Sequence, residues 1–252
     1  MNILLSPAKI MIEEPNKGNR PLFYEDSLAL REEIKTWSKE EMKKRFKASE
    51  ALNEKAYVAF HSPSPLGRAL FVYSGIAYQY LDAKSLKEEE LSYLQAHLCI
   101  LSGLYGLLRP LDQIDSYRLM MGSRGSFLGK KDLYAFWGDR IAKELKDDVT
   151  LNLASEEYAK AVRPYLPKEK FIDVFFGEEE NGKLVEKGVY AKMARGRMTR
   201  YLAAIQAKSI DDVKGFNELG YVCDEEKSLP TKLVFVKGKI EEGKKKLFEP
   251  DW

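Results

Sequence analysis

Hydrophobic positions in the first part of the chain alternate between short continuous runs and stretches with helical spacing. The run at residues 3–5, which stops at Ser6-Pro7, predicts a buried strand. Leu30, Ile34 and Trp37 recur at helical spacing, and Ser38 begins a capping pattern for a second helix. The same reasoning predicts a helix from Ser49 to residue 60, a strand at 69–73, helical structure at 88–101, a helix after Asp132, a strand at 149–153 and a helix capped by Ser155. This part of the sequence therefore predicts alternating strands and helices.

The later part of the chain has a different pattern. Asn181-Gly182 separates two runs of strand composition, at 171–176 and 183–191, and predicts a β-hairpin. A helix is expected from the apolar spacing of Met198, Tyr201, Leu202 and Ile205, and closing strands are expected at 219–223 and 232–236. No repeat and no long Gly/Ser linker interrupts the sequence. We therefore expect a mixed α/β fold, with one mixed sheet surrounded by helices, in a single domain over residues 1–252.

Composition is typical of a globular protein and argues against several classes. The chain has 252 residues, of which 44% are hydrophobic and 32% are charged. The net charge of +2 is too small to predict nucleic-acid binding, so an electrostatic partner must be sought in local clusters. No segment approaches the ~20 apolar residues of a membrane span, and the first residues lack the pattern of a signal peptide. We expect a cytoplasmic protein without a membrane partner.

Motifs for metals and for nucleophilic catalysis are scarce. His61 and His97 have no second histidine at metal-binding spacing, and Cys99 and Cys223 form no CxxC pair. We therefore expect no transition-metal site and no cofactor. Cys99 lies in an apolar stretch and is expected to be a buried, unreactive thiol. Residues 125–131 resemble a phosphate loop only superficially, because their glycines are one residue too close, and we expect a surface turn there.

Ser6-Pro7-Ala8-Lys9 is the first segment with candidate chemistry. It fits the S-x-x-K pattern, in which a lysine activates a serine nucleophile, but the companion motifs are missing. Ser6 also ends a predicted strand, where α/β proteins place ligands, and the cation of Lys9 lies close by. Nucleophilic catalysis, contact with an anion and a structural role remain open for this segment, and anion contact is favoured over catalysis.

Two glycines three residues apart, Gly103 and Gly106, lie among apolar residues in the segment 101–111. This arrangement resembles the hairpin of helix-hairpin-helix DNA-binding modules, which offers backbone N–H groups to a phosphate. The usual hairpin has its glycines two apart, and Pro110 would interrupt the following helix. Taken alone, the segment therefore favours a structural turn over a DNA-binding hairpin.

Residues 190–200 form the strongest cationic segment, with Lys192, Arg195, Arg197 and Arg200 and no acid. At helical spacing Lys192, Arg197 and Arg200 fall roughly opposite the apolar face, with Arg195 at its flank. Exposed helix faces usually mix both signs of charge, and arginine binds phosphate through two parallel hydrogen bonds. The segment therefore favours anion binding over a plain surface helix, and Arg118 is a candidate to join it.

Taken in order, these motifs resemble the bacterial peroxide stress protein YaaA family. The matching segments are SPAK at 6–9, LSGLYG at 101–106, LRPLD at 108–112, YRL at 117–119, MG at 121–122, KDLY at 131–134, FWGD at 136–139, NLAS at 152–155, EY at 157–158, YAK at 190–192, ARG at 194–196 followed by Arg200, GFN at 215–217 and GY at 220–221. The resemblance spans nearly the whole chain and is weakest at residues 24–60 and after Val236.

The resemblance implies a bacterial cytosolic protein that protects cells from hydrogen peroxide and is linked to lower free iron. It also implies a mixed α/β fold that binds duplex DNA through a positive cleft with a helix-hairpin-helix-like element. The family has no established enzymatic reaction, so the resemblance leaves the mechanism open.

Our favoured hypothesis is a non-catalytic protein that binds duplex DNA or another phosphate-bearing ligand. Gly103 and Gly106 would shape the hairpin, and the phosphates would meet Lys9, Arg109, Arg118, Lys192, Arg195, Arg197 and Arg200. The alternative is an enzyme that acts on a small anion or nucleotide-like substrate through Ser6, Lys9, Tyr105 and Arg118. Direct sequestration of iron is least favoured, because histidine and cysteine ligands are few. Both leading hypotheses require these segments to meet in one cleft.

Overall fold

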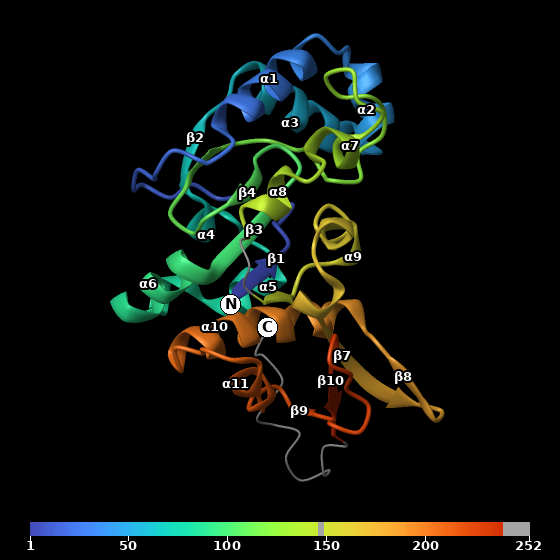
Figure 1. Cartoon of the computed structure of the whole chain (residues 1–252). Coiled ribbons are helices and arrows are strands. Elements are labelled where there is room, and N and C mark those ends of the chain that lie inside the picture. Colours follow the sequence, from blue (N-terminus) through green and yellow to red (C-terminus); the bar gives the residue numbers. More distant parts are fainter. Residues whose placement is uncertain (146–148, 239–252) are drawn as a thin grey trace.

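A mixed sheet runs through the centre of the computed structural model, which describes residues 1–145 and 149–238 (Figure 1). Its strand order is β4-β3-β1-β6-β7-β10-β9, and β8 pairs with β7 outside this path. The strands are β1 (Asn2–Leu5), β3 (Leu98–Ser102), β4 (Gly106–Leu108), β6 (Thr150–Asn152), β7 (Phe171–Glu180), β8 (Lys183–Val185), β9 (Tyr221–Cys223) and β10 (Lys232–Lys237). The five strands from β3 to β10 along this order are parallel, and β4, β8 and β9 each pair antiparallel with one neighbour.

Helices cover the sheet and extend beyond its ends. In Figure 1, α1 (Tyr24–Lys35), α2 (Lys39–Phe46) and α3 (Glu50–His61) lie at the top, and α10 (Gly188–Ala204) and α11 (Ile210–Lys214) lie at the bottom. The other helices are α4 (Ala69–Val72), α5 (Ile76–Leu81), α6 (Glu88–His97), α7 (Leu133–Trp137), α8 (Arg140–Lys143) and α9 (Glu156–Ala159), with short 3-10 turns at Ala83–Ser85, Arg163–Tyr165 and Lys168–Lys170. A separate two-stranded sheet pairs β2 (Pro65–Arg68) with β5 (Gln113–Asp115). The fold is thus the mixed α/β arrangement that the sequence predicts.

The strand β1 lies at the centre of the hydrophobic core. All four of its residues are buried, as are all five of β3, because helices and loops cover both faces of this part of the sheet. Parallel strands covered on both faces read as continuous apolar runs, and this is why residues 3–5 could be assigned as a strand from sequence.

Several local predictions are confirmed by the backbone. Asn181 and Gly182 both have positive φ, 50° and 74°, as a tight turn between β7 and β8 requires. Ser38 accepts a hydrogen bond from the N–H of Glu41, and Asp132 accepts one from the N–H of Ala135, so both cap helices as expected. Ser49 and Ser155 also stand at the N-cap positions of α3 and α9, but neither side chain forms the expected capping hydrogen bond.

Some element predictions are wrong. Residues 69–72 form the helix α4 and not a strand, because a short apolar run fits either element when it is buried. The helix expected at 88–101 ends at His97, where the chain turns into β3. Residues 188–191 belong to α10 and not to the hairpin.

The helix-hairpin-helix expectation for Gly103 and Gly106 is also wrong. Gly103 lies in the connection between the antiparallel strands β3 and β4, and Gly106 is the first residue of β4, so the glycines do not join two helices. A Cβ at Gly103 would lie 2.4 Å from the Leu119 carbonyl oxygen, and one at Gly106 would lie 2.8 Å from the Trp137 ring. Both glycines therefore serve close packing in the core.

The long helix α10 is packed on more than one side, which its sequence pattern does not reveal. Gly196 brings it against α5, where an added Cβ would lie 2.0 Å from the Ala77 carbonyl oxygen. Met198 and Leu202 are buried as predicted, whereas Ile205 lies just past the end of the helix and is exposed, and Ala194, Gly196 and Thr199 are buried as well. The face that was expected to meet solvent is therefore partly in contact with protein.

Among the described residues, no helix is both long enough and apolar enough to cross a membrane.

Candidate anion-binding cleft

The strand order places a topological switch point between β1 and β6. The chain leaves β1 toward β3 on one side, and it leaves β6 toward β7 on the other. Ligands of open α/β sheets bind in the crevice beyond the carboxyl ends of such strands. Ser6 follows β1 and Ser155 follows β6, and the N–H of Ser155 donates to Ser6 Oγ over 2.8 Å. The two hydroxyl oxygens are 3.3 Å apart, so the floor of this crevice joins both strand ends.

A cleft with a volume of about 530 Å³ opens at this switch point. Its walls come from the loop after β1, the segment 153–158 after β6, the first residues of α5, and α10. Three cations line it, Lys9, Lys192 and Arg195, together with one acid, Glu157. We name this feature the switch-point cleft.

The charges of the switch-point cleft leave a positive excess. Lys9 and Lys192 are exposed, and within the described chain neither ammonium group forms an ion pair or hydrogen bond. Arg195 is half-buried and pairs with Glu186 at 3.1 Å, while its Nε is buried without a partner. Glu157 already accepts a hydrogen bond from the N–H of Gly122 at 2.9 Å. The cleft is therefore suited to an anionic group.

Two buried tyrosines complete the floor with neutral hydroxyl groups. Tyr78 donates to the carbonyl of Ser6 at 2.9 Å, and Tyr158 contacts the sulfur of Met120 at 3.6 Å. Burial holds the pKa of both tyrosines well above the ordinary value of 10.0. Both hydroxyls are therefore protonated at neutral pH and add no negative charge that would repel an anion.

Four of the eleven predicted site residues line the cleft. Ser6, Lys9, Lys192 and Arg195 line the same cleft although they are distant in sequence. Sequence reasoning missed Ser155 as a site residue, because it was assigned only a capping role. Its position two residues after the predicted strand at 149–153, near a strand end as Ser6 is, was the signal that could have found it. The contribution of α5 was missed because no element was predicted for residues 76–81.

Arg109 lies away from the cleft. Its guanidinium donates to the carbonyl of Leu98 at 3.4 Å and contacts the sulfur of Cys99 at 3.1 Å. These residues begin β3, whereas the cleft is at the carboxyl ends of the parallel strands. Arg109 therefore lies at the amino ends of the parallel strands, opposite the end where the cleft opens.

Tyr105 and Arg118 also do not join the cleft. Tyr105 is 2% exposed, and its hydroxyl accepts a hydrogen bond from the N–H of Asp115 at 3.1 Å, so it is a core residue. Arg118 is half-buried, and its Nε has no hydrogen-bond partner among the described residues. Because neither residue lines the cleft, the four-residue catalytic hypothesis keeps only Ser6 and Lys9.

Arg197 and Arg200 form contacts within the protein. Arg197 forms an ion pair with Glu218. Arg200 donates to the carbonyls of Leu81 at 3.1 Å and Asp82 at 2.9 Å, at the carboxyl end of α5. Partners from other segments thus bind the arginines of residues 190–200. The sequence around these arginines does not reveal such partners.

Replacing Arg197 and Arg200 together with glutamine should therefore lower stability and leave anion binding unchanged. Loss of the hydrogen bonds to the α5 carbonyls should reduce the free energy of unfolding by about 1–2 kcal/mol. Denaturant titration would measure the loss, and binding of a labelled duplex at several salt concentrations would test the surface. A flatter dependence of log K on log salt in this variant would show that these arginines do contact DNA phosphates.

Cys99 matches the expectation of an unreactive thiol. It is buried, and burial raises its pKa to about 11 although the Arg109 guanidinium opposes the shift. Within the residues that the structure describes, no group of three or more His, Cys, Asp or Glu side chains is placed to hold a metal ion.

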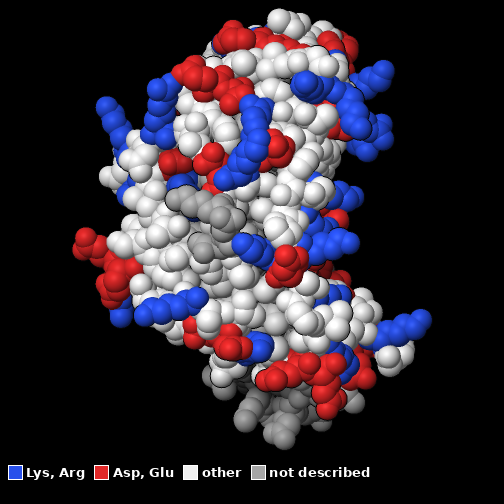
Figure 2. Space-filling view, viewed as in Figure 1, with Lys and Arg blue, Asp and Glu red and all other residues white. Residues whose placement is uncertain are grey.

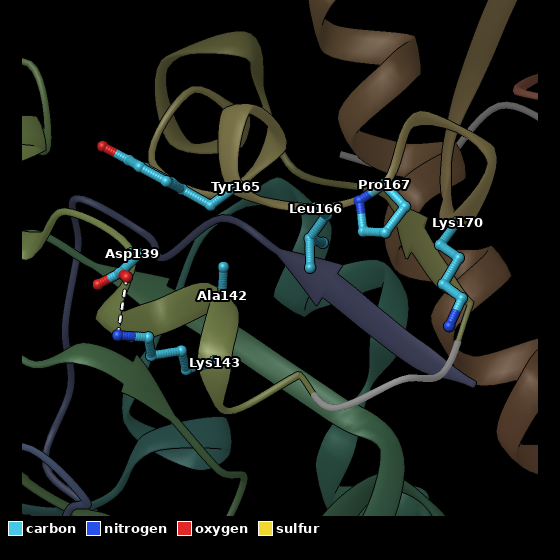
Figure 3. Close-up of a pocket in the computed structure, with 7 residues that line it drawn as sticks. All are labelled: Asp139, Ala142, Lys143, Tyr165, Leu166, Pro167 and Lys170. Atoms are coloured by element: carbon cyan, nitrogen blue, oxygen red, sulfur yellow. Dashed lines mark ion pairs between the residues drawn. The ribbon is translucent and has the colours of Figure 1, made fainter.

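A second pocket, of about 640 Å³, lies between α8 and residues 165–170 (Figure 3). Lys143 and Asp139 form an ion pair of 2.7 Å in its wall, so their charges cancel. The pocket lies near the amino end of β7, because Lys170 directly precedes that strand. It therefore lies at the amino ends of the parallel strands, whereas α/β proteins bind ligands at the carboxyl ends.

No broad basic surface replaces the switch-point cleft on the face shown in Figure 2. Basic and acidic side chains are intermingled over that face. The cleft remains the candidate site.

The fold and the cleft together define an α/β protein with an anion-suited site at the carboxyl ends of parallel strands. Residues 1–227 match the family model described as peroxide stress protein YaaA. A UPF0246 protein of Lachnoclostridium phytofermentans is 40% identical over 248 residues, covering 94% of this chain and 97% of that protein. A UPF0246 protein of Agathobacter rectalis is 37% identical over 244 residues, covering 93% of this chain and 98% of that protein. The chain belongs to the peroxide stress protein YaaA family.

Proposed function

We propose that the protein acts in the response to hydrogen peroxide by binding DNA phosphates at the switch-point cleft, without catalysing a reaction. One observation carries this proposal: Lys9 and Lys192, from distant segments, line the same cleft with no protein partner for their charges among the described residues. Phosphate contacts of this kind attract DNA of any sequence. The bound protein would then protect DNA from iron-dependent damage by covering it. The described residues provide no group of ligands with which the protein could bind iron instead.

The test is binding of a labelled duplex to a variant with Lys9→Gln and Lys192→Gln. Each lysine that contacts a phosphate contributes about 0.9 to the slope of log K against log salt, so the slope should fall by about 1.5–2. Binding should weaken equally for unrelated sequences, because phosphates carry no base information.

A matched control is the variant with Lys44→Gln and Lys183→Gln, which removes the same charge from exposed lysines outside the cleft. It should keep the wild-type slope, and circular dichroism should show that both variants are folded. Equal slopes for the cleft variant and the wild type would refute the proposal, as would absence of duplex binding by the wild type.

A second candidate function is an enzyme that acts on a small anionic or nucleotide-like substrate in the same cleft. The observation in its favour is that Ser6 Oγ lies at the switch point, where it accepts a hydrogen bond from Ser155, in a cleft that Lys9 also lines. Turnover of a phosphate ester that is lost in Ser6→Ala, with duplex binding unaffected, would favour this candidate.

A further inference from the structure

We infer that the switch-point cleft accepts a single nucleotide, with its phosphate at the cationic side chains and its base against an apolar wall. The inference rests on the proposed function, because it assigns the phosphate to the same lysines. It goes beyond the proposed function by naming the ligand that enters the cleft.

The size of the cleft selects the ligand. Its volume of about 530 Å³ falls within the range of about 300–1,000 Å³ that is usual for small-molecule sites. A B-form duplex, whose major groove alone is about 12 Å wide, cannot be enclosed by such a cleft. A duplex can touch its rim, but only one nucleotide can occupy it.

Cationic residues from two segments of the chain line the cleft, and one of them, Arg195, is already paired with Glu186. Lys192 and Arg195 are three residues apart in α10, so they share one face of the helix. Lys9 belongs to the loop after β1, which lines the same cleft. A lysine is a compact point charge and arginine offers a planar fork of donors, and both are common partners of phosphate.

The remaining lining is apolar where a base would lie. Ile10, Ile76 and Met120 line the cleft, and Ile10 is 64% exposed, so its side chain is accessible to a ligand. Enzymes that extrude a base place it between apolar or aromatic side chains. A ligand with a charge and no apolar body would leave this wall uncovered.

Polar groups for the edge of a base are also present. Ser74 and Gln79 line the cleft, and neither side chain forms a hydrogen bond with the described residues. An amide can donate to and accept from a base edge at once. Phosphate, apolar body and polar edge are the three parts of a nucleotide.

The nucleotide can come from two sources, a free nucleotide or an unpaired nucleotide in a DNA strand. The first experiment measures binding of deoxyadenosine monophosphate, deoxyadenosine and inorganic phosphate to the full chain. The monophosphate should bind about tenfold more tightly than inorganic phosphate, because base contacts add to the phosphate contact. Ile10→Ser should weaken the monophosphate about fivefold and leave inorganic phosphate unchanged.

The control for this variant is Ile12→Ser, which changes a neighbouring exposed isoleucine that does not line the cleft. Because both side chains are exposed, both variants should fold. Ile12→Ser should bind the monophosphate like the wild type. Equal affinity for the monophosphate and inorganic phosphate, or no effect of Ile10→Ser, would overturn the inference.

The second experiment compares a duplex that has one unpaired, bulged nucleotide with the fully paired duplex. About tenfold tighter binding of the bulged duplex, lost in Ile10→Ser, identifies DNA as the source. Monophosphate binding without preference for the bulge identifies the free nucleotide. If neither ligand is preferred but the slope for paired duplex still depends on Lys9 and Lys192, the inference fails and the proposed function stands.

Discussion

Replacing Gly196 with alanine should destabilise the protein by about 2 kcal/mol and weaken binding at the switch-point cleft. Alanine is normally better than glycine in a helix by about 1 kcal/mol, so an isolated α10 would gain from this change. In the protein, the new Cβ would lie 2.0 Å from the carbonyl oxygen of Ala77 and 2.8 Å from its carbonyl carbon. Backbone atoms cannot rotate away, so α10 and α5 must separate, and overpacking of this kind costs about 1–3 kcal/mol.

Gly188→Ala provides the control, because Gly188 begins the same helix and an added Cβ there meets nothing within 4 Å. It should be as stable as the wild type or slightly more stable. Urea titration of the three proteins measures stability, and monophosphate titration measures the cleft, whose walls include Ala77 and Arg195. If the Gly196 and Gly188 variants are equally stable, the two helices do not pack as closely as described.

Acidification should remove a large part of the stability through one carboxylate, Glu14. Its side chain is 7% exposed, and it accepts hydrogen bonds from the side chain of Arg68 at 2.7 and 3.2 Å and from the N–H of Arg68 at 3.1 Å. Burial opposes ionisation of Glu14, but the bonds from Arg68, with help from Asn16, outweigh it and lower the pKa to about 2.

Because the pKa of Glu14 is lower in the folded state, the folded protein binds fewer protons than the unfolded chain. The stabilisation is complete above about pH 4.5 and disappears as the pH falls toward 2. The shift sets an upper limit of about 3 kcal/mol, which screening near the surface will reduce. Glu14→Gln should therefore cost stability at pH 7 and flatten the loss between pH 4.5 and 2.

The measurement is the free energy of unfolding of the wild type and Glu14→Gln at several pH values. Glu13→Gln is the matched control, since Glu13 is exposed and adjacent. The difference between wild type and Glu14→Gln should shrink with acid, while that for Glu13→Gln should stay small. A constant difference across this range would show that the Arg68 contacts do not lower the pKa of Glu14.

Sequence patterns predict those parts of the fold whose causes are local. The strand at Ile3 and its neighbours, the cap at Ser38 and the turn at Asn181-Gly182 depend on a few adjacent residues, and all three are present. The apolar segment 69–73 contains no such local signal, because a buried helix and a buried strand both need apolar residues on every side. Pairing partners, such as β6 beside β1, depend on the whole chain.

The candidate site shows the same limit. Lys9 and Lys192 could be selected from sequence as anion contacts, and the structure brings them together. Arg197 and Arg200 looked equivalent to Lys192 in the sequence, but Glu218 and the end of α5 engage them. A window of residues shows the charge of a side chain and not the partners that distant segments supply.

The central position of β1 has a consequence for synthesis of the chain. Its two neighbours begin at Leu98 and Thr150, so one edge of this apolar strand stays open until β3 is made and the other edge until β6 is made. At about 5–20 residues per second, translation as far as β6 takes roughly 10–30 s. An unpaired apolar strand is a template for pairing with other chains. The nascent protein therefore needs its first residues shielded during this interval, and the contact between Ser6 and Ser155 can close only at its end.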